Sequence, residues 1–366
     1  MKLILYIGHH KVGSTALQGY LARNALALLE HGILYPAVES EGLIHLLALA
    51  TKRQAQPMLD RMNVREPHNA LAFRMLAKST GRETPPWHGV LPGLPIMLRT
   101  IRHQIELLQP QTVILCSEVF SNFGAGHEPM IEKLRDMFSE SGTELYCALR
   151  RPDEYLVSWY GQRLRFGYKM VPLAEGRALK DTETIHFDYR MLLAPWLQVF
   201  DGAKLHLRNY SDILAAGGSV EDFTARVGCD FPPSLSAKGP ANRGFPRAAF
   251  EILRQANAEL DPVEARRLRE FFLDLPPELS PIPDRDVEPF GADLRAELFA
   301  RFAPIHDYLS RLSGEGDFFP DLEEMLAPRP VPLAEASAEL LRQLDPHTMP
   351  TPTTSVFISR IKAALA

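Results

Sequence analysis

The sequence predicts an α/β protein: a P-loop-like three-layer sandwich with a central parallel sheet, followed by a mostly helical C-terminal part. Two observations lead to this prediction. Short apolar runs with strand character alternate with segments of helical periodicity over the first half of the chain, and from about Val220 onward helical segments separated by prolines take over. The predicted strands are Leu3–Ile7, Thr112–Cys116, Leu145–Leu149 and Lys204–Arg208.

The first predicted strand leads into a glycine-containing loop and then a helix. The strand ends at Gly8, and the helical pattern starts near Ser14 and continues to Glu30. The N–H groups of such a turn, together with the partial positive charge of the helix N-terminus, bind phosphate groups. Gly13 lets the backbone approach an anion closely, and we expect Ser14 and Thr15 to cap the helix and donate hydroxyl hydrogen bonds.

The position of the lysine separates this loop from that of ordinary ATPases and GTPases. Their motif is G-x-x-x-x-G-K-[ST], and Gly8 and Gly13 have the same separation. No lysine follows Gly13, because the lysine of the loop is Lys11, two residues earlier. The order K-x-G-S-T resembles the 5'-phosphosulfate loop of sulfotransferases that use 3'-phosphoadenosine 5'-phosphosulfate (PAPS). An incidental strand–helix turn is the alternative.

A second segment strengthens the resemblance to PAPS-dependent sulfotransferases. Residues 150–160 read R-R-P-D-E-Y-L-V-S-W-Y, which is similar to the family's 3'-phosphate motif R-x-P-x-[DE]-x-x-x-S-x-Y. The resemblance implies that Arg150 and Ser158 bind the 3'-phosphate, the arginine through paired N–H bonds and the serine through its hydroxyl. Taken alone, this segment also fits a surface arginine pair on an amphipathic helix.

The resemblance also implies roles in sulfuryl transfer from PAPS, with 3'-phosphoadenosine 5'-phosphate (PAP) as the product. Lys11 would contact the leaving group and the sulfuryl group, and the backbone at Gly13–Thr15 would hold the 5'-phosphate. Glu118 directly follows a predicted strand, where the family places a catalytic histidine or glutamate, so it is the expected base. Alternatively, Glu118 caps the next helix or pairs with an arginine. His10 is the second candidate for the base, and His127 lies farther from the strand end.

The acceptor is expected to be a hydroxyl on a carbohydrate or glycolipid, as in the bacterial members that the chain resembles. Side chains that either face the acceptor or pack their helix onto the sheet are Trp159, Arg163, Arg165 and Tyr168. A late basic loop is expected either to help close the 3'-phosphate site or to be a plain surface loop; its polar residues are Lys238, Asn242 and Arg243. No metal is expected, since Lys11 and backbone N–H groups can carry the charge.

Composition sets wider limits. The formal net charge of -5 over 366 residues gives no general nucleic-acid footprint. The three cysteines, Cys116, Cys147 and Cys229, are scattered, which fits a reducing compartment and no metal site. No leader pattern or apolar stretch long enough for a bilayer is visible, so we expect a cytoplasmic protein. The oligomeric state is not predicted.

The predicted organisation is one sulfotransferase domain over residues 1–325, with a less regular region at 40–95. That region is either a lid or, as we favour, a helical cover over the sheet. We expect residues 326–366 to form a tail rich in proline and alanine, partly disordered and with a short helix at 356–366.

Two other functional classes stay open. A nucleotide-dependent kinase of the P-loop type requires a lysine after the second glycine and a metal-binding aspartate at a strand end, and Glu118 is the nearest substitute. A non-catalytic protein would keep the nucleotide cleft without turnover. The presence of Lys11 and Glu118 disfavours that second class.

Overall fold

The computed structural model describes residues 1–366 except 54–55, 140–141, 234, 237–243, 315 and 365–366. The chain divides into two compact units. Unit 1 comprises Met1–Arg150, Tyr189–Ala241 and Ser310–Phe318, and unit 2 comprises Arg151–Asp188, Asn242–Leu309 and Phe319–Ala366. The predicted domain boundary near residue 325 stays a prediction.

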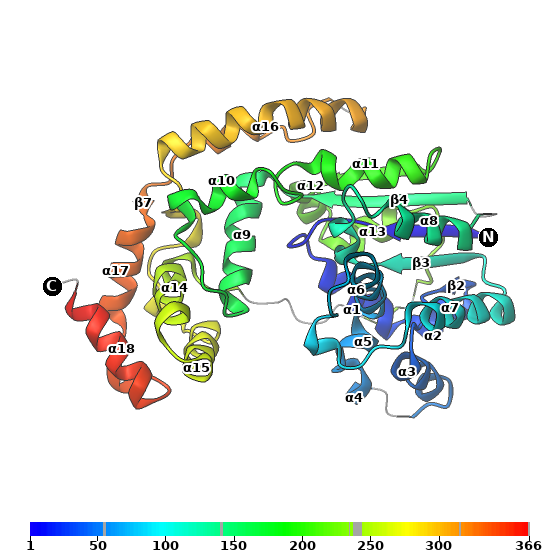
Figure 1. Cartoon of the computed structure of the whole chain (residues 1–366), viewed down its shortest axis with the longest axis horizontal. Helices are drawn as coiled ribbons and strands as arrows, with labels where there is room; N and C mark the ends of the chain where they lie inside the picture. The colour runs from blue at the N-terminus through cyan, green and yellow to red at the C-terminus, as the bar shows by residue number, and fades with distance from the viewer. Residues whose placement is uncertain (54–55, 140–141, 234, 237–243, 315, 365–366) are drawn as a thin grey trace. The chain divides into compact units, whose positions relative to one another are not determined.

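A five-stranded sheet in the order β2-β3-β1-β4-β5 forms the centre of unit 1. Every neighbouring pair is parallel, and Figure 1 shows the arrows of β3 and β4 pointing the same way. The parallel α/β class predicted from the sequence is therefore confirmed. The strands are β1 (Lys2–Tyr6), β2 (Ile33–Leu34), β3 (Thr112–Cys116), β4 (Gly142–Leu149) and β5 (Lys204–Asn209).

Helices connect the strands of unit 1. They are α1 (Ser14–Arg23), α2 (Ala25–Glu30), α3 (Ser40–Ala50), α4 (Gln56–Leu59), α5 (Met62–Arg65), α6 (Pro67–Thr80), α7 (Leu94–Leu108), α8 (Glu128–Met137), α11 (Tyr189–Val199), α12 (Tyr210–Ala215) and α13 (Ser219–Arg226). The region 40–95 is largely helical, and whether it is a lid or a cover over the sheet stays a prediction.

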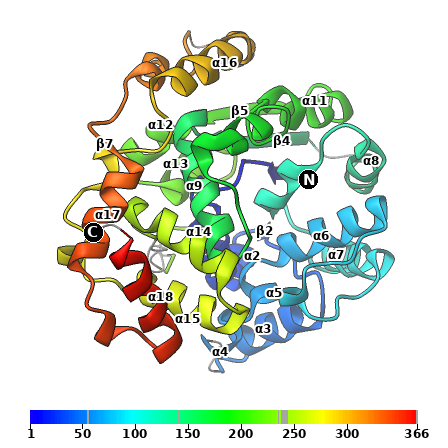
Figure 2. The same cartoon turned by 60° about the vertical axis from the view of Figure 1, so that its left-hand side comes forward.

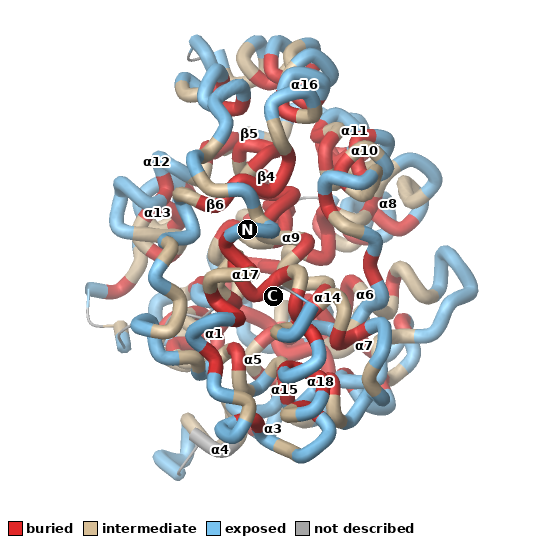
Figure 3. The backbone as a smooth tube through the Cα atoms, turned by 90° about the vertical axis from the view of Figure 1, so that its left-hand side faces the viewer, coloured by how far each residue is buried: buried red, intermediate tan, exposed pale blue. Residues whose placement is uncertain are grey.

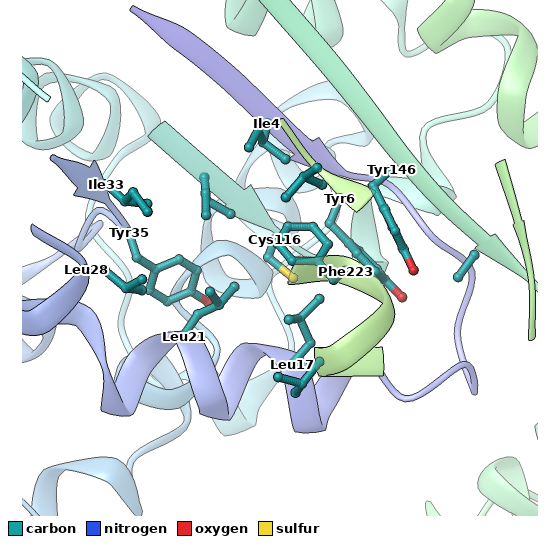
Figure 4. Packing of buried hydrophobic residues seen from close by; sticks show 14 of the residues in the cluster. Ile4, Tyr6, Leu17, Leu21, Leu28, Ile33, Tyr35, Cys116, Tyr146 and Phe223 are labelled. Atoms are coloured by element: carbon teal, nitrogen blue, oxygen red, sulfur yellow. The ribbon is translucent and has the colours of Figure 1, made fainter. Parts of the chain in front are cut away.

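Both faces of the sheet are buried, which explains the continuous apolar runs in the sequence. Alternate strand residues such as Tyr6 and Tyr146 pack against Leu17 of α1 and Phe223 of α13 (Figure 4). The residues between them point to the opposite face and are also fully buried; they include Leu3, Leu5, Val113, Leu115 and Leu145. Most of β4 accordingly appears as red tube in Figure 3.

Unit 2 is mostly helical, as predicted for the C-terminal part. Its helices are α9 (Pro152–Arg165), α10 (Ala178–Asp181), α14 (Phe250–Glu259), α15 (Pro262–Leu273), α16 (Ala292–Ser313, whose last turn belongs to unit 1), α17 (Leu333–Gln343) and α18 (Pro352–Ala363). A short parallel pair, β6 (Val287–Glu288) and β7 (Val331–Pro332), was not predicted. Figure 2 shows α17 and α18 beside α14 and α15, which they contact.

One predicted helix divides into two. The segment expected to be helical up to Glu30 is interrupted at Asn24, between α1 and α2. The Asn24 side-chain amide donates to the Tyr20 carbonyl at 2.9 Å, and its oxygen accepts from the Ser236 N–H at 2.8 Å. Asparagine side chains compete with the helix backbone in this way, so the break has a local cause.

In the part of the chain that the structure describes, no helix has both the length and the apolar character needed to cross a bilayer.

A buried histidine links α6 to the central sheet. His68 is fully buried; its Nδ1 accepts from the Cys116 N–H at 3.0 Å, so Nε2 carries the proton and donates to the Pro36 carbonyl at 3.1 Å. Burial lowers the pKa of His68 to about 3. The imidazole is therefore neutral in the folded protein at pH 7.

This neutral histidine makes stability depend on pH. The unfolded chain takes up a proton at His68 below its ordinary pKa of 6.5, whereas the folded protein does not until about 3. The stabilisation is therefore full above pH 6.5 and is lost as the pH falls. We expect His68 to remove about 2 kcal/mol of unfolding free energy between pH 7 and pH 5. Urea denaturation at both pH values measures this, and an unchanged pH dependence in His68→Gln contradicts it.

Candidate functional site at the carboxyl ends of the strands

The phosphate-loop candidate begins as an extension of β1 along β4. The Ile7 N–H donates to the Tyr146 carbonyl and the His9 N–H to the Ala148 carbonyl, each at 2.9 Å. Gly8 lies between them, and a Cβ there would come within 2.9 Å of the Ala148 nitrogen. Only glycine fits this close approach without displacement. The extension places the residues after His9 at the carboxyl end of the sheet.

The loop then turns through two residues with left-handed backbone. Lys11 has a φ of 64° and Gly13 a φ of 83°. Val12 between them is buried, and its carbonyl accepts from the Ser219 hydroxyl at 3.1 Å. A positive φ is unusual for lysine, and such strained residues cluster at ligand-binding sites. Lys11 is half-buried, directly before the N-terminus of α1.

The expected capping of α1 by Ser14 or Thr15 is wrong. Gly13 is the N-cap residue, and no side chain caps the helix. Ser14 is the first helical residue; it is buried, and its hydroxyl donates to the Glu118 carboxylate. The first N–H groups of α1 lack acceptors within their own helix, as in any helix, so they remain able to bind an anion.

Glu118 follows β3 and accepts hydrogen bonds from two helices. Gln18 of α1 donates to its Oε2 at 2.5 Å, and Asn69 of α6 donates to its Oε1 at 3.1 Å. It is not the cap of the following 3₁₀ turn, because the Ser117 hydroxyl accepts from the Val119 N–H at 3.0 Å instead. Burial raises the pKa of Glu118, although the hydrogen bonds oppose this effect.

A second carboxylate, missed in the sequence, lies beside Glu118. The Asn69 amide also donates to Glu66 at 2.9 Å, and its oxygen accepts from the Ser117 hydroxyl at 2.6 Å, which fixes the amide orientation. Burial and repulsion from Glu118 raise the pKa of Glu66. No spacing in the sequence connects residues 66 and 69 with 118, so sequence reasoning had no signal for them.

His10 is held by the turn that follows β3. Its Nε2 lies 3.2 Å from Asn122 Oδ1, an acceptor, so Nε2 carries the proton. Burial, together with the nearby charge of Lys11, lowers the pKa of His10 to about 4. A group with that pKa is a weak base at pH 7. Which of Glu118 and His10 is the base stays a prediction, and His127 contacts the Ser79 hydroxyl on α6.

Arg150 lies at the end of β4, on the same edge of the sheet. Its carbonyl accepts from the Tyr189 hydroxyl at 2.6 Å, and its guanidinium lies over the Tyr210 ring, 5.2 Å from the centroid. Leu149 of β4 pairs with Asn209 of β5, so Arg150 and Tyr210 are the residues that directly follow this pair. The cation–π contact orients the guanidinium without neutralising it.

The adjacent arginine has a different environment. Arg151 is 3% exposed in unit 2 and forms ion pairs with four carboxylates: Asp153 at 2.8 Å, Asp321 at 2.7 Å, Glu324 at 3.0 Å and Glu154 at 3.9 Å. Buried arginines with this many anionic partners are structural. Arg150 is the residue for which the sequence predicts phosphate binding, and that role stays a prediction.

The other residues that the sequence singled out lie on α9, after it, or in the late basic loop. Ser158 is half-buried on α9 in unit 2, and its predicted role stays a prediction. Trp159 stacks on His186 with centroids 4.5 Å apart, and Arg163 pairs with Asp181. Arg165 and Tyr168 are exposed. Lys238, Asn242 and Arg243 lie outside the described residues. Within the described ranges, no group of three or more His, Cys, Asp or Glu side chains has the geometry of a metal site.

Comparison with known proteins gives one distant similarity. No protein-family model matches the chain, and no curated protein matches it at a significant level. A sulfotransferase from Alicyclobacillus acidocaldarius, known from its crystal structure, is similar with a TM-score of 0.39 and 16% identity, covering 86% of this chain and 96% of that chain. At this level of similarity, an activity must be inferred from the residues of this chain itself.

The loop geometry predicts that position 13 accepts only glycine. In Gly13→Ala, the new Cβ would lie 1.9 Å from the Ser219 hydroxyl, and the φ of 83° would be strained in addition. We expect a loss of roughly 1–3 kcal/mol of stability or a displaced loop. Thermal unfolding of Gly13→Ala and of Gly13→Ala/Ser219→Ala separates the two effects. Equal stability of wild type and Gly13→Ala would contradict the described loop.

Substitution of each of the two neighbouring arginines should lower stability, but by different amounts. Arg151→Met leaves Asp153 buried without its closest cation, so we expect a loss of about 3–5 kcal/mol. Arg150→Met removes a half-buried guanidinium that lies over the Tyr210 ring, so we expect a smaller loss, of about 1–2 kcal/mol. Chemical denaturation of both variants measures the difference. Similar losses in both would show that Arg150 is also structural.

Proposed function

We propose that this chain is a PAPS-dependent sulfotransferase that transfers a sulfuryl group to an acceptor hydroxyl. One observation carries the proposal: the strand–loop–helix with Lys11, the base candidate Glu118 and the cation Arg150 follow the neighbouring strands β1, β3 and β4. Parallel strands bring such residues to one edge of the sheet, where ligands bind in α/β folds. Beside this, the sequence around Lys11 and Arg150 resembles the two phosphate motifs of that family.

Each residue has a defined task in the proposed reaction. The N–H groups at the start of α1, with Gly13 allowing close approach, bind the 5'-phosphate. Lys11 contacts the bridging oxygen and the sulfuryl oxygens, where negative charge accumulates. Arg150, oriented by Tyr210, binds the 3'-phosphate. Thr15 adds a hydroxyl donor beside the 5'-phosphate.

The transfer step is a displacement at sulfur. The acceptor oxygen forms a bond to sulfur while the bond between sulfur and the bridging phosphate oxygen breaks, and PAP leaves with that electron pair. The acceptor proton passes to the Glu118 carboxylate. The raised pKa of Glu118 strengthens it as a base, and its hydrogen bonds to Gln18 and Asn69 fix its position.

The acceptor class is the least constrained part. A hydroxyl on a carbohydrate or glycolipid is proposed from the bacterial sulfotransferases that the two motifs resemble. The exposed Arg165 and Tyr168 are candidate acceptor contacts.

One contact favours a second candidate, a kinase that uses a nucleotide with Mg²⁺. Ser14 starts the helix after the loop and donates to Glu118 at the end of β3. In P-loop enzymes, a hydroxyl and a carboxylate at these two places hold Mg²⁺. The position of Lys11 disfavours this candidate, since no lysine follows Gly13.

Thermal stabilisation by nucleotides distinguishes the two candidates. A ligand that binds only the folded protein raises its stability by RT ln(1 + [L]/Kd), which is about 2.7 kcal/mol at a hundredfold excess over Kd. We expect a shift with PAP that exceeds those with ADP and with ATP–Mg at equal concentrations. Arg150→Met should reduce the PAP shift, whereas Arg102→Gln, an exposed arginine on α7, should leave it unchanged.

The outcomes separate binding from catalysis. A shift with ATP–Mg but not PAP would favour the kinase, and no shift with any nucleotide would overturn both proposals. If PAP binds, Glu118→Gln should keep most of that binding but lose sulfuryl transfer from PAPS to a carbohydrate acceptor panel. Retained turnover in Glu118→Gln would exclude Glu118 as the base.

A further inference from the structure

A cavity of about 380 Å³ lies against β5, the last strand in the sheet order. We call it the basic cavity; it is lined by Lys204, Leu205, His206, Leu207, Arg208, Ala225, Arg226, Leu312 and Ser313. Four of these described residues are basic and none is acidic. No residue of the phosphate-loop candidate lines it, so the basic cavity is separate from the proposed PAPS site.

The strand geometry explains why the basic residues gather. Lys204, His206 and Arg208 alternate along β5, so their side chains point to the same side of the strand. Arg226 is the last residue of α13, where a cation is favoured by the helix dipole. Because β5 is the edge of the sheet, no further strand of it competes for this space.

Two of the four basic side chains already have partners. Arg208 makes paired hydrogen bonds to Asp222, at 2.8 Å to Oδ1 and 3.1 Å to Oδ2. His206 Nε2 lies 2.7 Å from Glu144 Oε2. The structure gives no ion pair between Lys204 or Arg226 and any described carboxylate. The basic cavity therefore keeps two cationic side chains available for an anion.

We propose that the basic cavity binds a small organic molecule that carries a phosphate or sulfate group, with Lys204 and Arg226 as its cationic contacts. The volume lies within the usual range for small-molecule pockets, roughly 300–1,000 Å³, and exceeds what an inorganic anion fills. Ala225 and Leu312 offer apolar surface for the organic part. Both oxyanions accept charge-assisted hydrogen bonds from the same donors, so one site serves either group.

Calorimetric titration at low ionic strength tests the proposal with phenyl phosphate and phenyl sulfate as probes. We expect saturable binding of at least one probe to the full chain, and the arm that binds identifies the preferred oxyanion. The double variant Lys204→Gln/Arg226→Gln should raise Kd about tenfold or more. The control Arg102→Gln/Lys133→Gln removes two exposed positive charges elsewhere in unit 1 and should bind as the wild type does.

Further variants distinguish the basic cavity from the phosphate loop and from diffuse surface charge. Lys11→Ala should still bind the probes. If Lys11→Ala lost probe binding while Lys204→Gln/Arg226→Gln kept it, the probes would bind at the loop, and the proposal would be overturned. Ala225→Trp keeps every charge but fills the cavity, so it should also weaken binding. Three other results would overturn the proposal. They are unchanged probe binding in a folded Ala225→Trp, a loss of binding in Arg102→Gln/Lys133→Gln equal to that in Lys204→Gln/Arg226→Gln, and no binding of either probe to the wild type. Loss of PAP binding is not expected in any cavity variant, so this test is independent of the proposed activity.

Discussion

The arrangement of the site depends on one half-buried carboxylate. Glu118 accepts hydrogen bonds from Ser14 and Gln18 of α1 and from Asn69 of α6, so it connects the helix after the phosphate loop with the end of β3 and with a helix from residues 40–95. Burying a carboxylate is costly unless donors surround it. The donors from separate segments supply this compensation, and in doing so they set where the loop and the base lie relative to each other.

The fold could be predicted because burial on both faces leaves a strong sequence signal. β3 begins and ends at the predicted residues, since a short apolar strand is a local feature of the sequence. The break at Asn24 and the β6–β7 pair were missed, because each depends on partners distant in the sequence. The same distinction applies to the candidate site: Lys11, Gly13 and Glu118 stand at strand ends, whereas Glu66 and Asn69 reach Glu118 only through the tertiary structure.

Neighbouring positions in the sequence can have separate roles when a unit boundary falls between them. Arg150 directly follows β4 in unit 1, and Arg151 begins a segment of unit 2 with four carboxylate partners. The sequence R-R-P offers no means of telling them apart. The folded structure tells them apart: Arg151 is buried among carboxylates, whereas Arg150 is half-buried and lies over the Tyr210 ring.

The left-handed backbone at Lys11 places two demands on one position that no single residue meets well. The backbone favours glycine or asparagine there, by about 1–2 kcal/mol, whereas an anion site requires a cation. If Lys11 is retained for its charge, two kinds of substitution should be rare: those by small residues that tolerate this backbone better, and those by other long side chains. The loop would then keep an unfavourable backbone conformation at Lys11 even without a ligand. Such a cost is characteristic of a residue retained for its chemistry and not for stability.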